Sequence, residues 1–159
     1  MSEIIIRTAQ SLRQLVVRQV QAIPEEMFDI KPDAFNNNIR WNVGHIVFWM
    51  DSYLSLCFRT GSAIPASYAE LFNSGTKPAD WTKAPPSKEE MIRELSLQLE
   101  QISEISPDSL NKPLESPLQM GPLAFHLAGE LFNFALIHEG LHLSTCGSLL
   151  KVIQAGHRN

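Results

Sequence analysis

The sequence predicts an all-α protein, an up-down four-helix bundle with a long connection between helices 2 and 3. Three observations lead to this fold class. Apolar residues recur at helical spacing in four segments, proline-rich stretches separate these segments, and no run alternates apolar and polar residues as a strand would. The chain has 159 residues, the length of one domain, and we expect that domain to span residues 1–159.

The first two predicted helices differ in how their apolar residues are distributed. The first runs from about Glu3 to Ala22 and is amphipathic, with Arg13 among the charged residues that lie mostly off its apolar stripe. The second runs from about Arg40 to Arg59 and is apolar nearly all round. Such a helix is normally packed on both sides. We expect the bundle core on one side of it, and a subunit interface is one option for the other.

The connection between the second and third helices, residues 61–86, is unusually long for a compact domain. It is rich in proline, and one short helical segment is expected near Ser67 to Phe72. Connections of this length are usually functional, for example as a lid. Ser87 and Glu90 then form a capping box, which predicts the start of a third helix that continues to about Ile105.

The last predicted helix carries the most informative motif of the chain. It follows an irregular segment at 107–121 and runs from about Pro122, which suits a first helical turn, to Gln154. Its H-E-x-x-H motif places His138 and His142 on one face, one turn apart, so that both imidazoles can bind the same ion. The competing interpretation is a pair of core histidines, each satisfied by a hydrogen bond.

Composition excludes several classes of protein. Lys and Arg number 13 against 17 Asp and Glu, so the formal charge of −4 leaves no basic excess for binding nucleic acid. No stretch approaches the roughly 20 apolar residues of a membrane span, and no targeting signal is found, so a cytoplasmic protein without membrane partners is expected. Cys57 and Cys146 cannot form a disulfide framework and have no neighbouring base or cation that would activate them.

The usual interpretation of H-E-x-x-H is a zinc protease, with Glu139 as general base and a third ligand downstream. That interpretation fails here because the short tail after His142 contains no Asp or Glu, and His157 lies almost at its end. A third ligand must then come from upstream. His45 is the candidate, because an unpaired imidazole would be costly in the middle of the apolar second helix. Facing helices of a bundle supply ligands to shared sites, and three ligands leave a position open for catalysis.

Four other residues are weaker candidates. Glu139 lies about 100° round the helix from His138, which suits a solvated carboxylate or a partner of a ligand better than a base. Glu130 either orients a ligand through its free ring nitrogen or is a surface carboxylate. Trp41 and Phe134 each precede a histidine by one turn, and each either lines a substrate pocket or belongs to the core.

These residues resemble a known family. The segment Trp41-Asn42-Val43-Gly44-His45 is similar to the W-N-x-x-H signature of the DinB-like (YfiT-like) metal-binding four-helix bundle family, and the H-E-x-x-H motif is similar to the C-terminal motif of that family. The stretch from Tyr68 to Trp81 is also similar, so the resemblance covers essentially the whole chain. One departure is that Leu143-Ser144 stands where many members carry a glycine.

The resemblance implies a divalent metal, often nickel or zinc, held by three histidines that match His45, His138 and His142. It also implies a frequent homodimer. Characterised branches of the family are transferases that use low-molecular-weight thiols, and related isomerases. The resemblance therefore predicts a metal-dependent enzyme that transfers a small thiol to an electrophile. The alternatives are a non-catalytic metal-binding bundle with a structural or ligand-binding role, and a metal-free scaffold.

Overall fold

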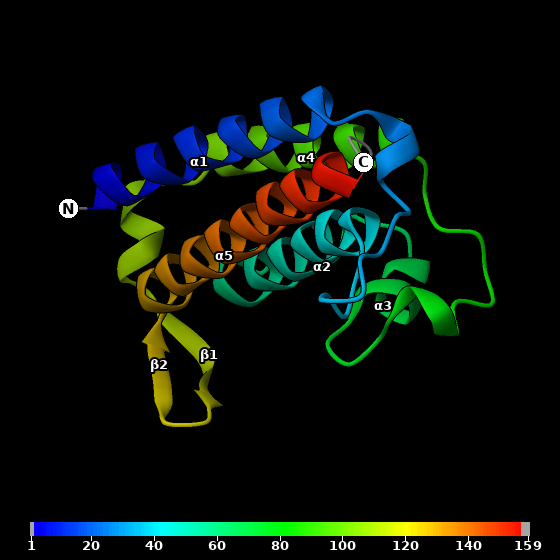
Figure 1. Cartoon of the computed structure of the whole chain (residues 1–159). Coiled ribbons are helices and arrows are strands. Elements are labelled where there is room, and N and C mark those ends of the chain that lie inside the picture. The colour runs from blue at the N-terminus through cyan, green and yellow to red at the C-terminus, as the bar shows by residue number, and fades with distance from the viewer. Residues whose placement is uncertain (1, 157–159) are drawn as a thin grey trace.

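Residues 2–156 are described by a computed structural model, in which four long helices form a bundle (Figure 1). They are α1 (Ser2–Ala22), α2 (Ile39–Phe58), α4 (Lys88–Ser103) and α5 (Ala128–Gly156). Helix α2 lies along α5, and α1 lies along α4, so that the two pairs enclose the core. The predicted all-α bundle is confirmed. Within the described residues, no helix is both long and apolar enough to cross a membrane.

Local signals account for the starts of two helices. The side chain of Asn38 accepts a hydrogen bond from the backbone N–H of Trp41 at 2.8 Å and so caps α2. Helix α4 begins with the predicted capping box, in which the Ser87 hydroxyl and the Glu90 carboxylate each accept a hydrogen bond from the backbone N–H of the other residue. Arg59, with a φ of 58°, ends α2 in the left-handed conformation.

Helix α2 is covered on several sides by the chain itself. It packs against α5 and α4, and its first half also packs against α3 (Ser67–Phe72), the short helix expected in the long connection. Gly44 is needed for this contact, because a Cβ atom at this position would clash with the ring of Phe72. The apolar character of α2 all round is therefore explained here by packing within one chain.

A β-hairpin corrects the prediction for the segment before the last helix. Strands β1 (Pro113–Met120) and β2 (Leu123–Leu127) pair antiparallel and project from the bundle (Figure 1). The expectations of no strand and of a helix starting near Pro122 were wrong. Gly121 has a φ of 57°, which suits a tight hairpin turn, and α5 starts at Ala128. The strands are mostly exposed, so they lack the clear alternation that a core-facing strand shows.

The apolar core divides into two clusters along the bundle. One contains the N-terminal half of α2 with the C-terminal half of α5, and the other contains the opposite halves of these helices. The boundary between the clusters falls between Val47 and Met50 on α2, and between Leu136 and Leu143 on α5. A layer of buried polar side chains lies near this boundary, and the candidate site belongs to it.

Candidate metal centre

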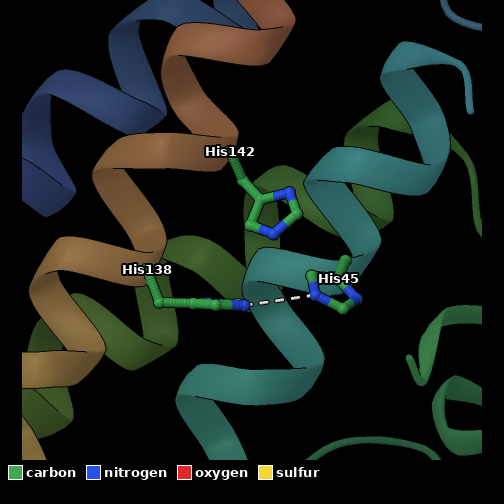
Figure 2. Close-up of side chains that lie close together, drawn as sticks. All are labelled: His45, His138 and His142. Carbon is green, nitrogen blue, oxygen red and sulfur yellow. Dashed lines mark hydrogen bonds between the residues drawn. The ribbon is translucent and has the colours of Figure 1, made fainter. Parts of the chain in front are cut away.

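Three histidines from two facing helices meet in the middle of the bundle (Figure 2). His45 extends from α2, and His138 and His142 extend from consecutive turns of α5. The Nε2 atoms of His45 and His138 are 3.2 Å apart, and one nitrogen from each of the three rings lies within 4.8 Å of the others. Two nitrogens that share a tetrahedral zinc ion are separated by about 3.3 Å, so the arrangement can hold such an ion after small side-chain movements.

The hydrogen bonds of His45 determine which of its nitrogens is available. Its Nδ1 lies 2.7 Å from the backbone oxygen of Phe72. A carbonyl oxygen can only accept, so Nδ1 carries the proton and the lone pair is on Nε2, the atom that faces His138. The long connection thus contributes to the site by fixing the tautomer of His45.

Asn42 fixes His142 in the same way. The Nδ1 atom of His142 lies 2.9 Å from Oδ1 of Asn42, while the Nδ2 group of Asn42 donates to the backbone oxygen of Asn38 at 2.8 Å. The Asn42 oxygen is therefore the acceptor, and the lone pair of His142 is left on Nε2. The W-N-x-x-H motif contains this asparagine, but no signal in the sequence assigned it the role.

Burial keeps the three imidazoles neutral. It lowers the pKa of His45 to about 3, against the opposing effect of the hydrogen bond to Phe72, and the two neighbouring histidines lower it further. Burial also lowers the pKa of His138 to about 4, and His142 shifts in the same direction for the same reason. Neutral rings offer lone pairs to a metal at pH 7 without having to release a proton.

Aromatic side chains surround the histidines. The ring of Trp41 stacks on His45 with centroids 4.4 Å apart and planes at 22°, and its Nε1 donates to Thr76 Oγ1 at 2.9 Å. Trp49 and Tyr53, which sequence reasoning missed, have ring centroids 6.2 and 5.9 Å from that of His138. Their positions one and two turns after His45 were the available signal.

Phe134, the other predicted pocket residue, has a different environment. Its ring packs against Tyr53 at 6.2 Å and against Phe125 of the hairpin at 5.2 Å. These contacts belong to the apolar cluster beside the site rather than to the immediate surroundings of the histidines. Of the two interpretations of Phe134, the structure favours the core one.

The structure places the two carboxylates near the motif in different surroundings. Glu130 is exposed, and its carboxylate accepts hydrogen bonds from the backbone N–H groups of His126 and Leu127 at 2.7 and 3.0 Å. It therefore joins the hairpin to α5 rather than orienting a ligand. Glu139 is 2% exposed and forms an ion pair with Arg13 at 2.9 Å, so of its two expected roles that of a solvated carboxylate was wrong.

Arg13, which was placed on the polar face of the first helix, is completely buried. Its partners lie on other helices, and no spacing rule within α1 could have revealed them. His157 lies outside the described residues. Among the residues that are described, the group that could hold a metal ion consists of His45, His138 and His142.

The fold and the site together define a class of protein. A four-helix bundle in which histidines from facing helices converge on one point is the architecture of a metal-binding bundle. The chain belongs to the DinB superfamily, because the model of that family matches residues 7–146. The match includes all three histidines. No curated protein matches the chain.

Proposed function

We propose that this protein is a divalent-metal-dependent enzyme that transfers a low-molecular-weight thiol to a small electrophile. The observation that carries the proposal is the shared orientation of two rings. His45 and His142 each donate their Nδ1 proton to a fixed acceptor, so both present Nε2 toward the centre that they form with His138. Nickel and zinc are the metals that we expect, because neutral imidazole is a good ligand for both.

Three protein ligands suit a catalytic site better than a structural one, because structural zinc sites are closed by four. A bound divalent ion would lower the pKa of a thiol or water that reaches it and so supply a nucleophile at neutral pH. The aromatic rings of Trp41 and Trp49 border the centre and provide apolar surface for the organic part of a small thiol.

The cysteines of the chain favour a thiol that comes from a substrate. Burial raises the pKa of both Cys57 and Cys146 to about 12, so neither provides a thiolate at neutral pH. In the proposed transfer, the sulfur of the small thiol bonds to an electrophilic carbon, and the leaving group departs with its bonding electron pair. The thiol proton passes to solvent.

Metal binding is tested by elemental analysis of protein purified without a nickel column and then reconstituted with nickel or zinc. We expect about one equivalent of metal in the wild type and much less in His45→Ala. The matched control is His126→Ala, which removes an exposed histidine from the hairpin and should leave metal content unchanged. Less than about a tenth of an equivalent in the wild type would refute the metal site.

Thiol transfer is tested by incubating metal-loaded protein with bacillithiol, mycothiol or glutathione and the electrophile monochlorobimane. We expect a conjugation rate with at least one thiol that disappears when the metal is removed and in His45→Ala. If metal-loaded protein shows no such rate with any thiol, the transferase proposal fails in favour of a non-catalytic metal-binding bundle.

A further inference from the structure

A chain of buried polar groups connects all four long helices at the level of the histidines. The guanidinium of Arg13 on α1 donates from Nη1 to Gln98 Oε1 at 2.8 Å and from Nη2 to Glu139 Oε2 at 2.9 Å. Gln98 on α4 donates from Nε2 to the backbone oxygen of Val47 at 2.8 Å. The side chains of Arg13, Gln98 and Glu139 are each at most 2% exposed.

The two ends of this chain lie next to the candidate metal ligands. Val47 is two residues after His45 on α2, and Glu139 directly follows His138 on α5. The histidines connect α2 to α5 directly, and the polar chain connects the same two helices through α4 and α1. Together they form the polar layer between the two apolar clusters of the core.

Stability alone is a poor explanation for these residues. Arg13 Nε and Glu139 Oε1 are buried without a hydrogen-bond partner among the described residues. A buried ion pair with unsatisfied atoms often contributes no more to folding than well-packed apolar side chains of similar volume. Beyond burial, the polar chain restrains the orientation of the helices, because hydrogen bonds require specific angles and apolar packing does not.

The orientation of the helices matters at a metal centre because a small rotation of a helix moves the ligands that it carries. A side-chain atom at the outer radius of a helix, about 5–6 Å from the axis, moves roughly 1 Å when the helix rotates by 10°. Functional groups must be held within about 0.5 Å to act together. Interlocked apolar side chains also oppose such a rotation of α5 against α2, and the bonds of Glu139 to Arg13 and of Gln98 to Val47 add a restraint on angle, because they lose alignment when the helices turn.

We propose that Arg13, Gln98 and Glu139 are positioning residues of the metal centre, which set the rotation of α2 and α5 so that their histidines converge. This inference rests on the proposed metal-dependent function. It also gives the glutamate of the H-E-x-x-H motif a role different from that of a protease base. Its carboxylate faces Arg13, and it acts on the metal through the position of His138.

The test replaces the whole network with apolar residues in the triple variant Arg13→Met, Gln98→Leu, Glu139→Leu. Three quantities are measured with the intact chain. They are the unfolding free energy of the metal-free protein, and the affinity and visible absorption spectrum of bound Co²⁺, which reports coordination geometry. We expect metal-free stability at or above that of the wild type, Co²⁺ affinity at least about tenfold lower, and a changed spectrum.

Two further variants separate positioning from general destabilisation. Ile102→Ala, which removes a buried side chain of α4 that does not belong to the network, should destabilise the protein but leave the Co²⁺ spectrum and affinity as in the wild type. Gln98→Leu breaks the link to α2 while keeping the pair of Arg13 with Glu139, and it serves if the triple variant does not fold. We expect it to fold and to bind Co²⁺ more weakly.

The inference would be overturned if the folded triple variant bound Co²⁺ with wild-type affinity and spectrum. If the triple variant does not fold, the same result in Gln98→Leu would overturn it. In either case the metal site itself would stand. Absence of Co²⁺ binding in the wild type itself would instead refute the proposed function on which the inference rests. The two failures are therefore distinguishable.

Discussion

The side-chain oxygen of Asn42 on α2 accepts a hydrogen bond from Nδ1 of His142 on α5, at 2.9 Å. The two residues are 100 positions apart in the chain, yet the tautomer of one depends on the other. Asn42 is itself held by its donation to the backbone oxygen of Asn38, the residue that caps α2. The start of α2 and the chemistry of the site are thus connected through one amide side chain.

Asn42→Ala should weaken metal binding, because His142 would lose the acceptor that keeps its lone pair on Nε2. Partners of this kind typically contribute 10- to 100-fold in metal affinity, and we expect a loss in this range by titration with zinc in competition with a chelator. Asn42→Asp retains an oxygen for His142 and should keep affinity closer to that of the wild type. Equal affinities in Asn42→Ala and the wild type would contradict this role.

Gly44→Ala should disturb the same site from the other side of α2. The added methyl group would clash with the ring of Phe72, whose backbone oxygen accepts from His45. We expect a loss of about 1–3 kcal/mol in unfolding free energy, measured with urea on metal-free protein, together with weaker zinc binding.

Gly140→Ala is the matched control, since Gly140 lies between the two histidines of α5 but has open space around it. This change should leave zinc binding intact and stabilise the helix by up to about 1 kcal/mol. If both alanine variants behaved alike, contact with Phe72 would not be the reason that position 44 is glycine.

Periodicity, caps and spacing were sufficient to predict the four long helices, the short helix in the connection and the pair of histidines on α5. These features depend on residues close together in sequence, such as Ser87 with Glu90 and His138 with His142. His45 is 93 positions from His138 and was found because an imidazole is unexpected in an apolar helix and because its segment resembles the W-N-x-x-H signature. The burial of Arg13 was missed although helical spacing indicates it, because Arg13 lies four residues after Ala9 and three before Val16, on the buried face of α1. Its charge was taken as a sign of exposure, and its partners Gln98 and Glu139, 85 and 126 positions away, could not be predicted.

The hairpin was missed for a different reason. Its first strand contains Pro113 and Pro117, which argue against a central strand but are tolerated in a two-stranded hairpin, where each strand is an edge. Most of its side chains are exposed, so no buried face imposed an alternating pattern. Pro122 is compatible with a first helical turn, and its position beside Gly121 in the turn was not recognised.

The cysteines should be unreactive in the folded protein. Burial raises the pKa of Cys57 and Cys146 to about 12, so at pH 8 both stay protonated, and the thiolate is the form that reacts. We expect iodoacetamide to alkylate both at least about 100-fold more slowly in native protein than in protein unfolded in urea, as followed by mass spectrometry. Rapid labelling of Cys57 in the native state would contradict this prediction and would indicate that a thiol of the chain itself is available for transfer.

Glu130→Gln should weaken the junction of the hairpin and α5 without affecting the metal centre. The exposed carboxylate accepts from two backbone N–H groups, and these two bonds lower its pKa, so it is ionised at neutral pH. A neutral amide is a weaker acceptor for both bonds, so the melting temperature should fall at pH 7. The difference in melting temperature from the wild type should shrink as the pH falls through the lowered pKa, because the wild-type carboxyl then becomes neutral as well.

Zinc affinity of Glu130→Gln should not change, since the carboxylate of Glu130 makes its contacts in the hairpin rather than at the histidines. A loss of zinc affinity comparable with that of Asn42→Ala would restore Glu130 as a residue that orients a ligand.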